Sequence, residues 1–449
     1  MYRKIIITLM VAITTALSAQ TPKKPATKPD GKNAEAQETK TAANEQDRKI
    51  EVLAQEIEKL KAGKDLFPQA KEQGRYGLGP AASKVYEINQ GVSIGGYGEF
   101  LYQRFAGTNQ SGNDSNKSSE FDTLRTVFYF GYKFNDKIVF NSEVEIEHAG
   151  RSASTTASGG TPSHSHAVYK PEVYAEFANL DFMLHPMLNI KAGLMLVPMG
   201  IYNEMHEAPT FLATTRPLTE QRVIPSTWRE NGAGIFGQIW DIAYKLYAVT
   251  SLDAKSSVDG FNSQGLRGGR QSGQKAVSNE FSAVFRADYV GIPGTTFGAS
   301  GYWGKSGQAD NHEHETTIVD AHADIRMKGI YLRGVMAYSQ VTGANKLASA
   351  GIGLADAMYG AYIEVGYDVF RFLNLNQELF PHIRIERIDT QYKVAAGNRF
   401  DAQYEQNVFT FGVAYKPIHQ ISAKIDYSIY SNKADTGVNQ LNFALGYLF

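Results

Sequence analysis

Residues 120–147 read EFDTLRTVFYFGYKFNDKIVFNSEVEIE, and the period of this stretch decides the fold. Apolar and polar side chains alternate on both sides of the turn signal Asn135-Asp136. Such alternation predicts two β-strands, each with one apolar and one polar surface. The apolar face carries Leu124, Phe128, Phe130, Tyr132, Ile138, Phe140, Val144 and Ile146, and the polar face carries Thr123, Arg125, Lys133, Asn141, Glu143, Glu145 and Glu147.

The same alternation recurs in sixteen segments between residue 91 and the C-terminus. Long polar connections and tight turns alternate between the segments. An even number of strands, with long loops at one end and short turns at the other, is the plan of an outer-membrane β-barrel. The segments begin near residues 92, 120, 138, 172, 187, 232, 242, 278, 295, 316, 330, 357, 378, 407, 421 and 438.

A soluble β-sandwich also alternates, but its apolar face should favour Val, Ile and Leu. Here Phe and Tyr gather near strand ends, as in the aromatic girdles at membrane interfaces. The predicted fold is therefore all-β: a 16-stranded antiparallel transmembrane β-barrel with a short N-terminal periplasmic coiled-coil helix. The chain ends with Tyr447 and Phe449 on one face of the last strand, which resembles a C-terminal sorting signal read by the barrel assembly machinery.

Composition excludes several classes of protein. The 449 residues include 45 Lys plus Arg and 46 Asp plus Glu, and the net charge of −1 argues against a nucleic-acid partner. The absence of Cys excludes disulfide scaffolds, thiolate zinc sites and Cys nucleophiles. No cofactor is predicted.

The N-terminal quarter divides by composition. Residues 1–19 have a charged start and an apolar core, as in a signal peptide, so the protein is exported. Residues 20–40 are rich in Pro and Lys and predict a disordered periplasmic linker. Residues 41–62 predict a short coiled-coil helix and residues 63–90 a connector to the barrel, which spans 91–449. The coiled-coil seam is Ile50, Leu53, Ile57 and Leu60.

The longest connection covers residues 198–231. A loop of this length is usually functional or disordered, and its apolar residues indicate order. We expect it to fold into the lumen and narrow the pore, although an outward surface loop is the alternative. Its candidate constriction residues are Glu204, His206, Glu207, Arg216, Arg222 and Arg229.

Strand alternation also predicts which charged side chains face the lumen. Acidic groups on one wall and basic groups on the others would create a field across the pore that steers charged or dipolar solutes. Solvated or paired lumen residues without selectivity are the alternative. The lumen-facing candidates are Arg125, Glu143, Glu145, Glu147, Glu172, Glu176, Lys191, Arg286, Arg333 and Arg384.

Catalytic and metal sites are not predicted. Asp320, His322 and Asp324 share one strand face, but spacing singles out no serine to complete a hydrolase triad. The segments 164–166 and 312–315 contain His in loops, where ordinary exposed side chains are the simpler interpretation. An adhesin or receptor acting through the extracellular loops is the alternative function.

Four segments carry a resemblance to a known family. AGLMLVPMGIYNEMHEAPTFLATTRPLTEQRVIPSTWRENGAGIFG (192–237), GLGPAASKVY (77–86), GGYGEF (95–100) and FGVAYKPI (411–418) resemble porins of the phosphate-selective porin O and P superfamily. The overall layout also resembles dicarboxylate-type porins, which are trimers with a periplasmic coiled coil. The resemblance implies a homotrimeric passive channel narrowed by an inward loop. A phosphate-selective pore would carry a ladder of Arg and Lys, whereas this chain mixes Glu with Arg.

These expectations together describe an outer-membrane porin, a passive diffusion channel for small hydrophilic solutes. Its partners would be outer-membrane lipid, the solutes, two further copies in a homotrimer, and the barrel assembly machinery during biogenesis.

Overall fold

The protein is described by a computed structural model that divides into two units, Met1–Gly63 and Lys64–Phe449. The described residues are 48–55, 70, 74–150, 173–255, 260–308, 314–349, 353–373, 375–394, 396 and 400–449. Some predictions lie outside these residues: the signal peptide 1–19, the linker 20–40, and the side chains of Ile57, Leu60 and Glu172.

The described part of the first unit is helical over residues 48–55. Ile50 and Leu53, which begin the predicted seam, are 63% and 59% exposed. Among the described residues, no helix combines the length and the apolar character that a bilayer crossing would require.

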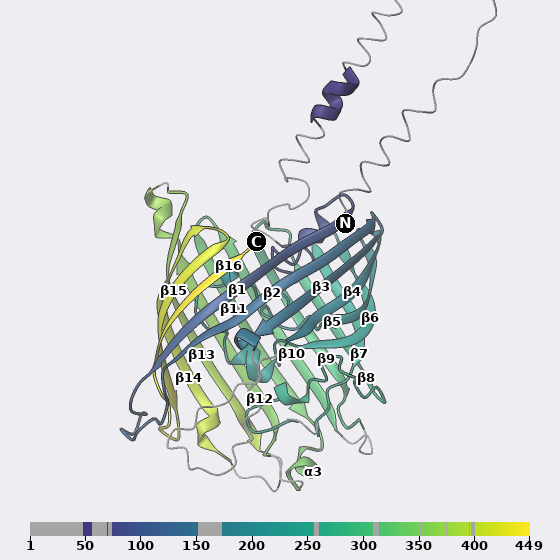
Figure 1. The fold of residues 1–449 in the computed structure, drawn as a ribbon. Coiled ribbons are helices and arrows are strands. Elements are labelled where there is room, and N and C mark those ends of the chain that lie inside the picture. Colours follow the sequence, from purple (N-terminus) through teal and green to yellow (C-terminus); the bar gives the residue numbers. More distant parts are fainter. Residues whose placement is uncertain are drawn as a thin grey trace, which may run out of the picture. The chain divides into compact units, whose positions relative to one another are not determined.

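The second unit contains a closed barrel of sixteen antiparallel strands, in which each strand pairs with its neighbours in sequence and β1 pairs with β16 (Figure 1). This confirms the predicted fold, and every strand begins within three residues of its predicted start. The strands are β1 (Gly91–Phe105), β2 (Glu120–Asn135), β3 (Ile138–Glu147), β4 (Val173–His185), β5 (Leu188–Leu196), β6 (Arg229–Ile239), β7 (Ile242–Thr250), β8 (Phe281–Tyr289), β9 (Thr295–Lys305), β10 (Glu315–Met327), β11 (Ile330–Val341), β12 (Ala355–Tyr367), β13 (Glu378–Val394), β14 (Glu405–Ile418), β15 (Ile421–Asn432) and β16 (Gln440–Leu448).

Short helices lie in the connections. They are η1 (Lys84–Tyr86), η2 (His148–Gly150), η3 (Ala208–Thr210), η4 (Thr219–Val223), η5 (Arg267–Gly269), α3 (Ala344–Ser349), η6 (Val369–Leu373) and η7 (Ala402–Tyr404). Long loops gather at the lower rim of Figure 1, where α3 lies, and the short turns gather at the opposite rim with the C-terminus. We call these the loop rim and the turn rim.

One boundary in the sequence analysis was wrong. Arg229 is the first residue of β6 rather than part of the preceding loop, and it pairs with Leu196 of β5. The connection between β5 and β6 therefore covers residues 197–228. Arg229 stands two residues before the exposed Asn231, yet its side chain is buried and pairs with Glu176. The polar start of β6 shows no apolar alternation, so the sequence analysis did not identify it as part of a strand.

The two faces of each strand differ as a barrel in lipid requires. In β8, Phe281 and Phe285 are 61% and 50% exposed, whereas the alternate residues Val284 and Arg286 are buried. Large apolar side chains thus face outward and charged ones face the interior, which is the reverse of a soluble protein. Closure leaves no unpaired strand edge, so the backbone hydrogen bonds are satisfied within the sheet.

The closing seam between β1 and β16 depends on two glycines of the GGYGEF segment. The Gly96 N–H donates to the Phe449 carbonyl oxygen at 3.1 Å, and the Phe449 N–H donates back at 2.9 Å. A Cβ on Gly96 would lie 2.7 Å from the Phe449 ring, and one on Gly98 would lie 2.4 Å from the Tyr447 hydroxyl. The glycines therefore leave room for the terminal aromatic rings on the outer face.

Replacing Gly96 with Val should weaken barrel closure. The new Cβ would also meet the Val127 carbonyl oxygen at 2.4 Å, and overpacking of this kind costs about 1–3 kcal/mol. The measurement is the unfolding temperature of the detergent-solubilised barrel, followed by heat modifiability. Gly107→Val is the matched control, because nothing lies within 4 Å of a Cβ there. Equal stability of the two variants would contradict this account of the seam.

Candidate functional site

Residues 197–228, here called the inner loop, run through the interior of the barrel. The helix η3 within the loop contacts β1, β15 and β16, whereas η4 contacts β11, β12 and β13. Since the loop itself starts from β5 and returns to β6, it reaches walls on several sides. Tyr202, Leu212 and Trp228 are fully buried.

Carboxylates hold the backbone of the inner loop. Glu220, from the loop itself, accepts from the backbone N–H groups of Ile201 and Tyr202, both at 2.7 Å, and from the Tyr362 hydroxyl at 2.5 Å. Burial raises the pKa of Glu220. The wall supplies further acceptors: Asp426 accepts from Thr214 N–H at 2.6 Å and Glu386 accepts from Thr219 N–H at 2.5 Å.

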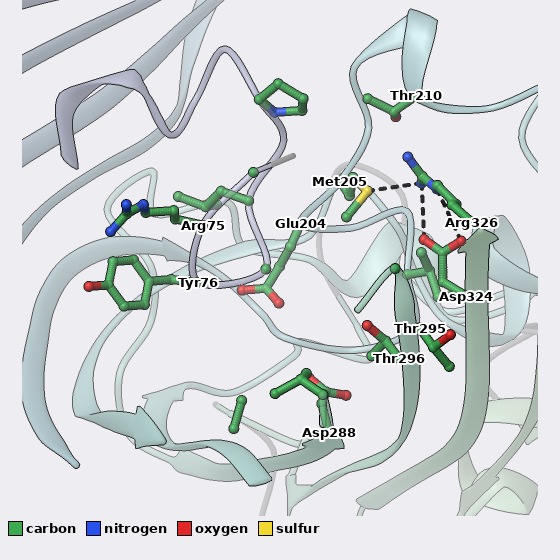
Figure 2. A pocket seen from close by; sticks show the side chains of 18 of the residues that line it. Arg75, Tyr76, Glu204, Met205, Thr210, Asp288, Thr295, Thr296, Asp324 and Arg326 are labelled. Carbon is green, nitrogen blue, oxygen red and sulfur yellow. Dashed lines mark hydrogen bonds and ion pairs between the residues drawn. The ribbon is translucent and has the colours of Figure 1, made fainter. Parts of the chain in front are cut away.

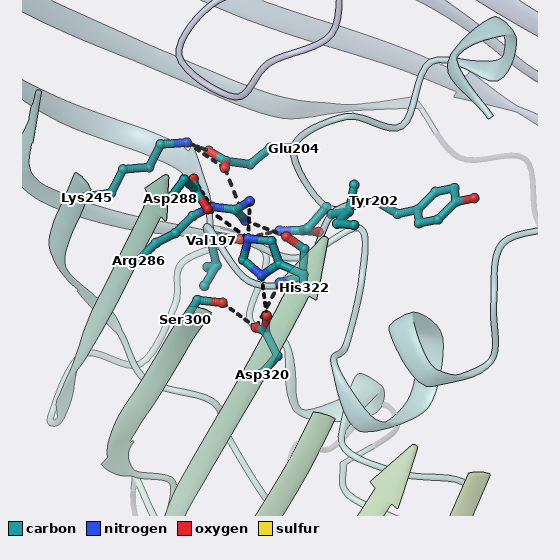
Figure 3. Close-up of polar contacts among 12 residues, drawn as sticks. Val197, Tyr202, Glu204, Lys245, Arg286, Asp288, Ser300, Asp320 and His322 are labelled. Atoms are coloured by element: carbon teal, nitrogen blue, oxygen red, sulfur yellow. Dashed lines mark hydrogen bonds and ion pairs between the residues drawn. The ribbon is translucent and has the colours of Figure 1, made fainter. Parts of the chain in front are cut away.

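A second anchor surrounds Gly200, which has a φ of +64° that favours glycine. Figure 3 shows the wall residues of this anchor, among them Arg286, Asp320 and His322. Its N–H donates to Asp320 Oδ2 at 3.1 Å, and its carbonyl oxygen accepts from Arg286 Nη1. Both wall residues are buried and stand on neighbouring parts of the sheet, in β10 and β8. The wall therefore binds both backbone polar groups of one loop residue, Gly200.

His322 lies at the centre of this anchor. Its Nδ1 lies 2.7 Å from Asp320 Oδ1, and its Nε2 lies 2.8 Å from both Asp288 Oδ1 and Arg286 Nη2. Ser300 donates to Asp320, not to the imidazole. With both ring nitrogens taken by these partners, His322 does not present the Ser–His contact of a hydrolase. Within the described residues, no group of three or more His, Asp or Glu could hold a metal ion.

Three glutamates on β3 and β4, Glu143, Glu145 and Glu176, form what we call the acidic wall. All three are fully buried, and each has a basic partner. One partner, His206, comes from the inner loop, and the other two come from β2 and the start of β6. The contacts are a hydrogen bond between Glu143 and His206 (3.1 Å) and the ion pairs Glu145–Arg125 (3.6 Å) and Glu176–Arg229 (2.5 Å).

The wall formed by β10 to β13 carries a row of alternating charges, here called the charge belt. Asp324, Arg333, Glu364 and Arg384 stand directly opposite one another on successive strands. Arg333 Nη2 lies 2.9 Å from Asp324 Oδ2, and Arg384 Nη1 lies 3.5 Å from Glu364 Oε2. Arg384 Nη1 also donates to the Thr215 carbonyl oxygen of the inner loop at 2.7 Å.

Among the described residues, the other charged ones predicted to face the lumen or to lie in the inner loop are buried or half-buried in the barrel. Lys191 Nζ lies 2.8 Å from Asp181 Oδ1, and Glu147 is half-buried opposite Arg125 in the sheet. In the inner loop, Arg216 and Arg222 are half-buried, whereas Glu204 and Glu207 are buried. Glu204 binds Lys245 Nζ through both carboxylate oxygens at 2.6 Å.

A cavity of about 1260 Å³ lies beside the inner loop on the side of the turn rim (Figure 2). Arg75 and Tyr76 line it on one side and Met205 on another. Asp324 and Arg326 project into it from β10, paired at 3.0 Å between Oδ2 and Nη2. The lining thus includes charges of both signs, and three pairs of them, Asp324–Arg326, Asp288–Arg286 and Glu204–Lys245, lie within ion-pair distance.

Comparison with known proteins places the chain in a family. No family model matches it. An uncharacterised protein of Aquifex aeolicus (strain VF5) is 36% identical over 375 residues, which cover 81% of each chain. The chain belongs to the same family as this Aquifex protein.

Solved structures with the same fold are outer-membrane porins. OmpF of Salmonella typhi, in complex with daunomycin, is 12% identical with a TM-score of 0.51, covering 80% of this chain and 98% of that one. The anion-selective porin from Comamonas acidovorans is 10% identical with a TM-score of 0.50, covering 80% and 100%. At such identities the likeness shows the fold, which is that of an outer-membrane porin barrel.

Sequence reasoning missed residues 74–90, here called the entry segment, which it treated as a connector. Ala81, Ala82 and Val85 of this segment are buried among barrel residues. The available signal was the run of small residues in GLGPAASKVY (77–86), which suits close packing against other backbone. The roles of Glu220 and Tyr362 had no local signal, because their contact spans 142 residues of sequence.

His206 should make folding stability sensitive to acid. Burial, with Arg216 nearby, lowers the pKa of His206 from 6.5 to about 4. The unfolded chain takes up this proton at the higher pH, so stability present above pH 6.5 is lost as the pH falls through 4, by about 3 kcal/mol. The measurement is the free energy of unfolding at pH 7 and pH 4 for the wild type and His206→Gln. The free energy of unfolding should fall less between pH 7 and pH 4 in the variant than in the wild type. An equal fall in both proteins would contradict a buried neutral imidazole at His206.

Proposed function

We propose that the protein is an outer-membrane porin, a passive channel for small hydrophilic solutes that carry charge or a dipole. The observation that carries this proposal is the inner loop, seated on charged walls inside a barrel of sixteen strands. A barrel of this size is wide enough for an aqueous channel, so a loop inside it sets the width. The fold shared with OmpF and the Comamonas porin supports the same proposal.

The proposed constriction is an ordered structure rather than a mobile plug. Backbone N–H groups at residues 200, 201, 202, 214 and 219 each donate to a buried carboxylate. Lys424 Nζ donates to the carbonyl oxygens of Ala208 and Ala213 at 2.8 and 3.2 Å. These hydrogen bonds hold the loop at a fixed distance from the barrel walls. A channel that selects solutes by size needs such a fixed opening.

The proposed solute preference follows from how the charges are arranged. The acidic wall lies on β3 and β4, whereas Arg333 and Arg384 of the charge belt lie on β11 and β13. Opposed charges across a narrow, partly desolvated space orient dipolar solutes. Since each charge also has a partner, the pore would discriminate modestly between ions rather than exclude one sign.

The assembly of the protein is also part of the proposal. The exposed Ile50 and Leu53 on the helix of residues 48–55 would join other copies in a periplasmic coiled coil of a homotrimer. Residues 1–19 would be the signal peptide. Tyr447 and Phe449 would be read by the barrel assembly machinery. The likeness to the phosphate-selective porin O and P superfamily and to dicarboxylate-type porins remains a resemblance of these sequence features.

Channel activity can be measured directly. The purified wild type should produce discrete conductance steps in planar lipid bilayers, and deletion of residues 205–226 should raise the single-channel conductance because the interior is cleared. Deleting residues 108–115 from an exposed loop is the matched control and should leave conductance unchanged. A wild type without steps would contradict the proposed function, and an unchanged conductance after the inner deletion would contradict the constriction.

The acidic wall should influence ion selectivity. Glu145→Gln removes one charge while keeping the side-chain shape, and leaves Arg125 with a weakened partner. The reversal potential in a KCl gradient should shift toward anions, most strongly at low ionic strength. Glu120→Gln, at an exposed position on the loop rim, is the control with the same change in charge. Equal reversal potentials in all three proteins would contradict a role for the acidic wall.

A further inference from the structure

The entry segment is bound to the inner surface of the barrel at several points. The Tyr86 hydroxyl donates to Asp181 Oδ2 at 2.6 Å. Asn141 Nδ2 donates to the Ala82 carbonyl oxygen at 2.9 Å. Lys133 Nζ donates to the carbonyl oxygen of Ile88, also at 2.9 Å. These partners lie on β2, β3 and β4, so one side of the segment is fixed to the wall that also carries the acidic residues.

The other side of the segment contacts the inner loop through Glu207. Its two carboxylate oxygens accept from the backbone N–H groups of Ala81 at 3.1 Å and Ala82 at 2.9 Å. Glu207 is only 1% exposed, so this contact is shielded from solvent. Burial raises the pKa of Glu207 to about 7, and a buried N–H that loses its acceptor is costly whichever form the carboxyl group takes. Glu207 therefore couples the loop to the segment.

Two glycines make this approach possible. A Cβ on Gly79 would lie 2.5 Å from the Glu207 carboxyl carbon. Gly77 has a φ of +85°, and a Cβ there would lie 2.7 Å from Lys245 Nζ and 3.1 Å from Glu204 Oε2. The pair of glycines thus faces the pair of loop glutamates. A larger residue at Gly79 would push the Glu207 carboxylate from its place, and one at Gly77 would meet the end of the Lys245 side chain.

We propose that the entry segment is a latch that fixes the edge of the inner loop nearest the turn rim, with Glu207 as the positioning residue. The loop is then clamped between wall carboxylates on one side and the segment on the other. The cavity of about 1260 Å³ is lined by both, through residues 74–78 and Pro80 of the segment and through Glu204 and Met205 of the loop. The width of the pore toward the turn rim is therefore set jointly by the two. This inference rests on the proposed porin function.

The conductance test uses two variants that break the contact from opposite sides. Glu207→Gln leaves one acceptor oxygen and turns an amide NH₂ toward a backbone N–H, and Gly79→Ala pushes the carboxylate away. Each should raise the mean single-channel conductance or its fluctuation, and the double variant should add little, because both remove one contact. Gly107→Ala and Glu120→Gln are the controls.

Trypsin gives a second measurement that does not depend on conduction. Lys84 within the segment is 5% exposed, whereas the Arg75 side chain is 50% exposed. Cleavage of the folded, detergent-solubilised barrel after Lys84 should be slow in the wild type and faster in both latch variants, with cleavage after Arg75 as the internal reference.

The outcomes separate the two proposals. Faster cleavage after Lys84 with raised or less steady conductance supports the latch. If the wild type conducts and the variants match it in conductance and in cleavage, the latch is wrong and the porin proposal stands. If neither wild type nor variants conduct, the porin proposal fails and the latch, as a determinant of pore width, fails with it. If conductance steps occur in the variants but not in the wild type, the entry segment closes the pore in the wild type, which would support the latch.

Discussion

The structure inside this barrel depends on one constraint. Irregular backbone in the interior needs hydrogen-bond partners, and the backbone of the surrounding sheet cannot supply them. The strands pair only with one another, so the backbone N–H groups of the inner loop and the entry segment have no ladder to join. Side-chain carboxylates fill this role. Glu220, Asp320, Glu386 and Asp426 serve the loop, and Glu207 serves the segment.

The same constraint explains why the inner wall is so rich in charge. A carboxylate that accepts backbone N–H groups still needs a cation when it is buried, since an isolated buried charge is expensive. Other buried carboxylates of the wall have such cations: Arg286 lies beside Asp288, Arg333 beside Asp324 and Arg229 beside Glu176. Two wall arginines also hold the loop directly, because Arg286 donates to the Gly200 carbonyl oxygen and Arg384 to that of Thr215. Charges that appear in the sequence as a solvated pore lining are thus also the structural support of the loop. Selectivity and stability draw on the same residues.

Sequence and structure agree where the information is local. Alternation with a period of two depends on neighbouring residues only, so all sixteen strands were found with small errors at their ends. Arg229 was assigned to the loop because a strand that starts with Arg-Glu-Asn carries no apolar alternation. Contacts between residues on opposite sides of the lumen could not be predicted from the sequence. Glu207 and Ala82 are 125 residues apart, and no periodicity relates them.

The contact between the entry segment and the inner loop leaves only a weak pattern in the sequence. Gly77 and Gly79 stand two residues apart, and the carboxylates that approach them, Glu204 and Glu207, stand three apart. Neither spacing predicts the other, because closely spaced glycines and closely spaced glutamates in a loop are each common. Together with a fixed barrel diameter, however, they leave few arrangements in which Glu207 finds backbone donors while Glu204 binds Lys245. The closed sheet fixes the distance between the segment and the loop, and that distance turns two weak local patterns into one specific contact.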